Sequence, residues 1–125
     1  MTELRQIAAQ GRELAPYAVE LRRHLHRHPE PTAREFETVK FICGQLSELG
    51  IPYHSIPDGG VLAEIRGTGS EDPSAPHVLL RADCDALTME ESETVAGRPR
   101  VCRSENPGVA HMCGHDSHMA MLLGS

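Results

Sequence analysis

An apolar run in the second half of the chain constrains the fold more than any other feature. Residues 77–86 read HVLLRADCDA, and the run opens without alternation of apolar and polar side chains. A strand that is covered on both faces has this pattern, because both rows of its side chains are buried. The run therefore predicts a buried strand with other elements packed above and below it.

Helical periodicity precedes this strand. Apolar residues recur at three- and four-residue steps from residue 2 to about residue 27. Gly11 and Pro16 interrupt the pattern, so two shorter helices and one kinked helix are both consistent with it. A second helix is predicted between Thr32, which has capping-box spacing to Glu35, and Gly50, which suits the left-handed position after a helix end.

The period changes after the second helix. Two short β-like segments, 52–56 and 61–67, flank the turn PDGG, and a loop over 67–76 leads to the buried strand. A last helix is predicted to begin near Asp116. Helices, short strands, a buried strand and a final helix together indicate a layered α/β fold.

Length, charge and cysteine usage bound the function. A chain of 125 residues is at most one domain, and its net charge of −6 comes without the basic cluster that nucleic acid requires. No apolar run approaches the about 18 residues that span a bilayer, and the amino terminus lacks a signal-peptide layout. We therefore expect a cytoplasmic protein whose four cysteines are thiols, although an oxidising compartment would allow three pairings.

Two carboxylates follow the predicted strand. Asp83 and Asp85 are two residues apart, so on a strand they point to the same side, at the end where open α/β sheets place their sites. A divalent cation would relieve their repulsion. Capping of a turn or simple solvation explains the spacing equally well. Glu90 and Glu91 are better explained as an exposed acidic edge.

The most specific chemical signal is HMCGHDSH at residues 111–118. Thiolate and imidazole suit a transition metal such as zinc, and Gly114 lets the chain bend so that Cys113 and His115 can turn toward one ion. Asp116 is expected to cap the final helix, and it is also a candidate carboxylate behind His115.

Other side chains in this region have a second interpretation. His111 and His118 are candidate ligands, but packing at a rim with a bond to the backbone is the simpler role for each. Cys102, Cys113, His115 and His118 could together form a structural zinc site, although their spacing is not usual for a zinc finger.

The motifs resemble a known family. LRRHLHRHPEP, VLLRADCDALTMEE and RSENPGVAHMCGHDSHMAMLLG occur in this order and are similar to the N-terminal third of the amidohydrolase branch of the dinuclear metallopeptidases. This branch includes N-acyl-amino-acid amidohydrolases, hippurate hydrolases and auxin-conjugate hydrolases. The resemblance implies that residues 1–125 are part of a three-layer α/β/α catalytic domain, and it implies cleavage of the amide bond of a small N-acyl amino acid or a related amide.

The resemblance also assigns roles by position. Cys113 and His115 fall on metal ligands, and Asp85 falls on the catalytic-site aspartate behind the metal pair. The implied cofactor is a pair of divalent transition ions, zinc, manganese or cobalt, which activate a shared water. Asp83 stands where sister branches have a ligand histidine, which puts its own role in doubt. His26 belongs to a segment that we interpret as structural.

Three departures leave the implied ligands untouched. Thr88, Cys84 and Ser117 replace a commoner proline, methionine and glycine. The general base, the remaining ligands and the smaller domain that covers the site and forms a homodimer are expected beyond this segment. We therefore expect an incomplete domain that is inactive alone. The alternative is a noncatalytic zinc-binding or interaction module in which the metal supports folding.

Overall fold

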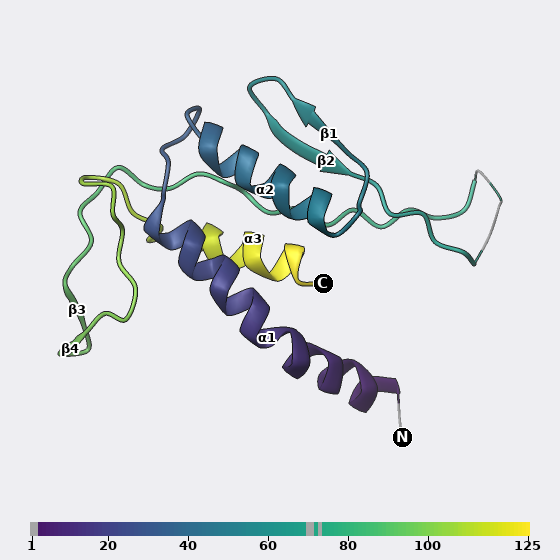
Figure 1. Cartoon of the computed structure of the whole chain (residues 1–125), viewed down its shortest axis with the longest axis horizontal. Helices are drawn as coiled ribbons and strands as arrows, with labels where there is room; N and C mark the ends of the chain where they lie inside the picture. The colour runs from purple at the N-terminus through teal and green to yellow at the C-terminus, as the bar shows by residue number, and fades with distance from the viewer. Residues whose placement is uncertain (1–2, 70–71, 73) are drawn as a thin grey trace.

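Helices and small antiparallel hairpins make up the regular structure in a computed structural model that describes residues 3–69, 72 and 74–125 (Figure 1). The predicted start of the first helix at residue 2 and residues 70, 71 and 73 of the predicted loop lie outside the described residues. The elements, in chain order, are α1 (Glu3–Arg27), α2 (Phe36–Glu48), β1 (Tyr53–Ile56), β2 (Gly60–Ala63), β3 (Thr94–Val95), β4 (Arg98–Pro99) and α3 (His115–Leu123).

The first helix, α1, continues through Pro16, so the alternative of two shorter helices is wrong and a single helix that contains the proline is found. Only its second half is buried. Leu21 and Leu25 lie in the core, whereas Leu4 and Ile7 are exposed, because α3 packs on α1 and no described element covers its first turns. The apolar periodicity therefore predicts the helix correctly and its burial only in part.

The predicted capping box of α2 is wrong. Thr32 makes no capping bond, and the carboxylate of Glu30 accepts the backbone N–H groups of Glu37 and Thr38 at 3.2 and 2.7 Å. An acidic group at this end also interacts favourably with the helix dipole. Glu30 is thus the residue that satisfies two of the free N–H groups of the first turn.

The predicted end of α2 is confirmed. Gly50 has a φ of 68°, and the N–H of Ile51 bonds to the carbonyl oxygen of Leu46 at 2.9 Å while the N–H of Gly50 bonds to Ser47. These two bonds form a Schellman motif, which needs a residue in the left-handed region. Glycine adopts that region without the steric cost of a Cβ atom.

The two short β-like segments form a hairpin, as the sequence predicts. β1 pairs with β2 in antiparallel register, with Tyr53 opposite Ala63 and Ile56 opposite Gly60. The hairpin lies beside α2 (Figure 1). A second hairpin, β3–β4, was not predicted; its two-residue turn at Ala96 and Gly97 has positive φ at both positions.

The predicted buried strand at 77–86 does not form. Val78, Leu79 and Leu80 are 87%, 80% and 61% exposed, and Figure 1 shows the segment as an extended tube that never becomes an arrow. A strand needs a neighbour for its backbone N–H and C=O groups. None of the described residues pairs with 77–85. The α/β class is confirmed. The strand that was predicted at its centre, however, is not formed by residues 77–86.

The core is small and lies where α1, α3 and the connections between them meet. Two isolated bridges join these connections: Pro31 with Ala86, and Leu87 with Ala110. Ala86 and Ala110 are buried, together with Leu25 of α1 and Met119 of α3. This arrangement places the end of the 77–86 segment directly beside the segment that precedes α3.

Candidate functional site

Asp85 and His115 meet in a half-buried position, as the sequence predicts for a carboxylate and an imidazole of one site. Nδ1 of His115 lies 2.9 Å from the backbone oxygen of Asp85 and 3.0 Å from its Oδ1. The bridge between Leu87 and Ala110, with backbone hydrogen bonds of 3.0 and 2.9 Å, holds the two segments together. This backbone pairing brings Asp85 and His115 together, although 30 positions separate them in the sequence.

The backbone contact fixes the tautomer of His115. A carbonyl oxygen can only accept a hydrogen bond, so Nδ1 must carry the proton. In the neutral imidazole, Nε2 is then the nitrogen with a free lone pair. Histidines that bind metals have this arrangement, with the second nitrogen donating to a carbonyl or a carboxylate. The tautomer of His115 is therefore the one that binding of a cation through Nε2 would need.

Thr32 completes the surroundings of Asp85. Its hydroxyl donates to Oδ2 of Asp85 at 2.6 Å. This hydrogen bond lowers the pKa of Asp85, and the neighbouring His115 lowers it further. Asp85 is consequently ionised at neutral pH, with one oxygen held by the hydroxyl and the other by the imidazole. A side chain predicted to cap a helix thus supports the site.

Gly114 provides the predicted bend. It precedes α3 with a φ of 95°, in the left-handed region. The thiol of Cys113 is free and the residue is exposed. Joint ligation of a metal by Cys113 and His115 stays a prediction, since no contact between these two side chains defines their relative orientation.

His118 and Asp83 are the other candidate residues near the Asp85–His115 pair. The ring of His118 lies 6.0 Å from that of His115, measured between centroids, and His118 is exposed. Asp83 forms an ion pair with Arg81 at 2.7 Å, whereas Asp85 contacts His115. The two aspartates therefore have different partners, and a shared pocket for both carboxylates stays a prediction.

His111 is buried rather than placed at a rim. The residue is 4% exposed, and neither ring nitrogen has a hydrogen-bond partner within the described residues. The predicted bond to the backbone is therefore absent there. Burial lowers the pKa of His111, so the imidazole is neutral at neutral pH. A buried polar group without a partner costs about 1–3 kcal/mol.

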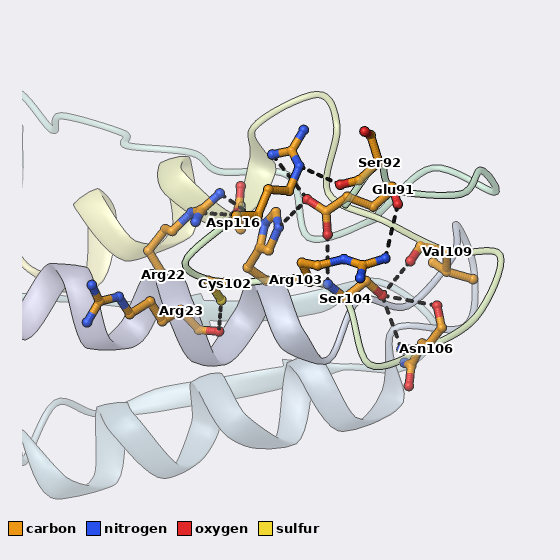
Figure 2. Close-up of polar contacts among 12 residues, drawn as sticks. Arg22, Arg23, Glu91, Ser92, Cys102, Arg103, Ser104, Asn106, Val109 and Asp116 are labelled. Atoms are coloured by element: carbon orange, nitrogen blue, oxygen red, sulfur yellow. Dashed lines mark hydrogen bonds and ion pairs between the residues drawn. The ribbon is translucent and has the colours of Figure 1, made fainter. Parts of the chain in front are cut away.

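Behind the site lies a buried charged cluster, which we define as Arg22, His26, Glu91, Arg100 and Asp116. Nδ1 of His26 is 2.8 Å from Oδ2 of Asp116, and Nε2 is 2.9 Å from Oε1 of Glu91. Arg22 binds Asp116 at 2.8 Å and Arg100 binds Glu91 at 3.3 Å. Figure 2 shows Arg22 and Asp116 reaching toward each other, with Glu91 linked to Ser104 farther along.

The cluster favours charged forms of its members. The hydrogen bond to Asp116 raises the pKa of His26, despite the opposing effect of burial. Burial alone would raise the pKa of Asp116, but the hydrogen bond to His26 and the charge of Arg22 lower it. Burial has the same effect on Glu91, and its pKa is lowered by the N–H of Ser104 and by His26. Opposite charges thus stabilise one another here.

The cluster contains the residues that sequence reasoning missed. Glu91 was expected on an exposed acidic edge together with Glu90; Glu90 is exposed, but Glu91 is 7% exposed and fully paired. The predicted cap by Asp116 is wrong, because α3 begins at His115 and Gly114 is at the N-cap without a side-chain bond. Asp116 lies in the first turn, where one oxygen accepts the N–H of Ser117 at 2.9 Å and the other contacts His26 and not His115. No local pattern marks Glu91, because its partner is 65 residues away.

The donor set fits a divalent transition ion in part. His115 presents a free imidazole nitrogen, Cys113 an exposed thiol and Asp85 an ionised carboxylate that orients the imidazole. Among residues 3–69, 72 and 74–125, however, no three or more His, Cys, Asp or Glu side chains are grouped so that they could hold a metal ion. Cys102, the fourth member of the alternative zinc site, donates its S–H to the backbone of Arg23 instead.

Two further findings concern the predicted setting of the protein. All four cysteines, Cys43, Cys84, Cys102 and Cys113, are free. No helix within the described ranges is long and apolar enough to cross a membrane.

Comparison with curated proteins gives several relatives, although no protein-family model matches the chain. N-acetyl-L-cysteine deacetylase of Bacillus subtilis is 43% identical over 106 residues, which cover 84% of this chain and 23% of the relative. A probable hydrolase of Synechocystis is 38% identical over 124 residues, 98% of this chain and 29% of the relative. IAA-amino acid hydrolase ILR1-like 4 of Arabidopsis thaliana is 37% identical, covering 94% and 24%.

Solved structures agree with these relatives. The YXEP protein of Bacillus subtilis, described as a dinuclear metal binding peptidase from the M20 family, matches with a TM-score of 0.75 and 34% identity. The match covers 90% of this chain and 30% of that one. A putative aminohydrolase from methicillin-resistant Staphylococcus aureus matches with a TM-score of 0.72 and 30% identity, covering 98% and 30%.

The extent of the matches defines what the comparison covers. The chain spans between 23% and 29% of the length of the curated relatives described above, and 30% of the two solved chains. Both comparisons include nearly all of the present residues and lead to the same group that the motifs predict. The chain is homologous to one part of the amidohydrolases and dinuclear metallopeptidases of the M20 family.

Proposed function

We propose that this chain supplies one side of a metal-dependent active site that hydrolyses the amide bond of small N-acyl amino acids or related amides. The observation that carries the proposal is the Asp85–His115 pair, which leaves Nε2 of His115 free while a carbonyl and a carboxylate hold Nδ1. Relatives named as an N-acetyl-L-cysteine deacetylase and an IAA-amino acid hydrolase support this substrate class.

His115 and Cys113 are the residues that would hold the metal, with zinc, manganese or cobalt as candidate ions. A bound pair of divalent ions would supply an activated water and polarise the substrate carbonyl. Asp85 would keep the imidazole in the correct tautomer, and Thr32 would keep Asp85 oriented. Free cysteines are typical of a reducing compartment, so a cytoplasmic location is part of the proposal.

A chimera provides the direct test. The chain would replace the matching segment of the Bacillus subtilis N-acetyl-L-cysteine deacetylase, and hydrolysis of N-acetylcysteine would be measured with added zinc, manganese or cobalt. We expect the chimera to be active and His115→Ala to lower kcat/KM by at least about 100-fold, because metal ligation is lost. His77→Ala, which changes a histidine with no assigned role, is the matched control and should retain activity.

The isolated chain answers a second question. We expect negligible turnover of N-acetyl and N-benzoyl amino acids by residues 1–125, because a four-coordinate site needs more ligands than Cys113 and His115 provide. Robust metal-dependent hydrolysis by the isolated chain would contradict this part of the proposal. An active chimera that is unaffected by His115→Ala would contradict the assigned metal ligand.

The noncatalytic zinc module is the second candidate, and the dense Cys and His segment at 111–118 motivates it. It predicts one tight zinc ion per isolated chain and loss of helical circular dichroism when the ion is chelated. The amide hydrolase predicts weak binding to the isolated chain and a helical spectrum that persists after chelation. A zinc titration of the isolated chain, followed by circular dichroism spectra before and after chelation, therefore distinguishes the two proposals.

A further inference from the structure

The buried charged cluster joins three segments that are distant in the sequence. Arg22 and His26 belong to α1, Glu91 and Arg100 lie on either side of the β3–β4 hairpin, and Asp116 is in the first turn of α3. His26 is 2% exposed, and both carboxylate side chains that it contacts are 1–2% exposed. A side chain so placed fixes the relative position of all three segments.

The hydrogen bonds require His26 to be an imidazolium. Its two nitrogens face oxygen atoms of two different ionised carboxylates, and a carboxylate can only accept. Both nitrogens must therefore donate. Nη2 of Arg22 is also 3.0 Å from Nδ1, but a protonated nitrogen cannot accept from it, so the ion pair of Arg22 with Asp116 is the contact that places the guanidinium.

The cluster reaches the candidate site through one peptide bond. Asp116 follows His115 directly, and its carboxylate is held by His26, Arg22 and the N–H of Ser117. On the other side, the imidazole of His115 is held by Asp85. The first turn of α3 is therefore fixed from both sides. Gly114, with its freedom of rotation, is the adjoining point where the chain could move if one side were released.

We propose that His26 is a positioning residue for the metal motif: its imidazolium fixes Asp116 and thereby orients His115 for a divalent transition ion. The inference rests on the proposed function for the identity of the ion. It assigns to a histidine of α1, far from the Cys and His segment in sequence, a role in the affinity of that segment for metal. His26 itself contacts neither the ion nor the substrate.

The test compares three variants of the full 125-residue chain. His26→Gln removes the imidazolium, and Glu91→Gln removes only one of its two charged partners. Leu25→Ala is the matched control, because Leu25 is equally buried on the same helix and its loss weakens the core without removing a charge. Circular dichroism measured against temperature identifies the range in which each variant is folded, and both readouts are taken within that range.

The first readout is independent of metal. Side-chain ¹⁵N NMR reports the tautomer of His115, which is the Nδ1–H form in the wild-type chain. We expect a mixture of tautomers in His26→Gln, a smaller change in Glu91→Gln and the wild-type tautomer in Leu25→Ala. The second readout is Co²⁺ affinity, which we expect to fall about 10- to 100-fold in His26→Gln and to remain near wild type in Leu25→Ala.

Three results would overturn the inference. A folded His26→Gln with the wild-type tautomer and affinity would show that Asp116 does not need the imidazolium. An equal loss in Leu25→Ala would make the role of His26 purely structural. If His26→Gln does not fold, an unchanged tautomer in Glu91→Gln decides against the inference. A wild-type chain without Co²⁺ affinity, together with a tautomer change in His26→Gln, would instead contradict the proposed function and leave the positioning role intact.

Discussion

The interface between α1 and α3 and the extended segment at 77–80 contrast in how their side chains are satisfied. In the interface, every charge of the buried cluster has an opposite partner within 3.3 Å. In the segment, three consecutive apolar side chains are mostly exposed. Ionisable side chains such as Asp116 and Glu91 are thus buried, whereas the apolar side chains of Val78, Leu79 and Leu80 are exposed.

This difference shows that burial depends on partners rather than on residue type alone. Asp116 and Glu91 are buried because cations reach them from α1 and from the chain beside β4. Leu79 and Leu80 are exposed because no described element pairs with their backbone. Exposed apolar side chains on an unpaired extended segment are a site for association with another chain. The following predictions change one region at a time.

The largest effect is expected from Asp116→Asn. The substitution leaves the buried His26 and the partly exposed Arg22 with one carboxylate fewer, and breaking a buried ion pair on one side costs about 3–5 kcal/mol. Urea unfolding of the wild-type and variant chains measures this difference in the free energy of unfolding. A loss below about 1 kcal/mol would show that the cluster is solvated in solution and would remove the contrast between the two regions.

The pH dependence of stability is the next effect. The pKa of His26 is raised from 6.5, so the stability that its protonation contributes is complete below pH 6.5 and is lost as the pH rises through the folded value. Asp116 and Glu91 have lowered pKa values, so their contribution is lost on the acid side. Urea midpoints between about pH 5 and pH 9 should fall at high pH.

The control for this profile is His26→Gln. Arg22 and His111 also act on the cluster electrostatically, but Arg22 keeps its charge. The pKa of His111 is lowered on folding, so its titration favours the folded state as the pH rises and has the opposite sign to the alkaline decrease. The alkaline decrease should therefore be reduced in His26→Gln relative to the wild type. Parallel profiles for the two chains would assign the decrease to other groups, such as the thiols.

A moderate loss of stability is expected for Gly50→Ala, because only the backbone conformation at residue 50 opposes the substitution. A Cβ atom there would meet no atom within 4 Å, so Gly50→Ala tests only the cost of a φ of 68°, which is about 1 kcal/mol. Gly44→Ala within α2 is the matched control, since its Cβ would also lie in open space and alanine favours the helix by about 0.5–1 kcal/mol. Thermal unfolding should therefore shift in opposite directions for the two variants.

The smallest effect on stability is expected for Leu79→Ser. The side chain is 80% exposed, and surface substitutions usually change the free energy of unfolding by less than about 0.5 kcal/mol. Light scattering at increasing protein concentration should show less association, because an apolar side chain has been removed from an unpaired segment. A destabilisation above about 2 kcal/mol would mean that the segment is buried in solution and resembles the interface.

The sequence predicted the elements whose signals are local. Both N-terminal helices, the Schellman glycine, the first hairpin and the start of α3 follow from periodicity and from turn residues within a few positions. The Asp85–His115 contact was also anticipated, because a strand end and a Cys and His segment are typical parts of one site. The resemblance to the amidohydrolases was recognised from the same motifs, and the relatives agree with it.

The parts that sequence reasoning missed depend on distant residues. The partner of Glu91 is His26, and the partner of Asp85 besides His115 is Thr32, 53 residues earlier. A capping box and an isolated acidic pair look the same whether or not such a partner exists. The predicted strand failed for the same reason, since its apolar pattern contains no information on whether a neighbouring strand is present in the described chain.

The reciprocal backbone bonds between Leu87 and Ala110 have a consequence for protein engineering. They close the loop of residues 88–109 at its base, on the side where Asp85 and His115 lie. The turn at Ala96 and Gly97 forms the far tip of this loop. A change in length at the tip is therefore separated from the metal motif by a closed pair of hydrogen bonds. A fluorescent label or an affinity peptide inserted between Ala96 and Gly97 would therefore leave the backbone pairing beside Asp85 and His115 in place, provided that Glu91 and Arg100 keep their contact.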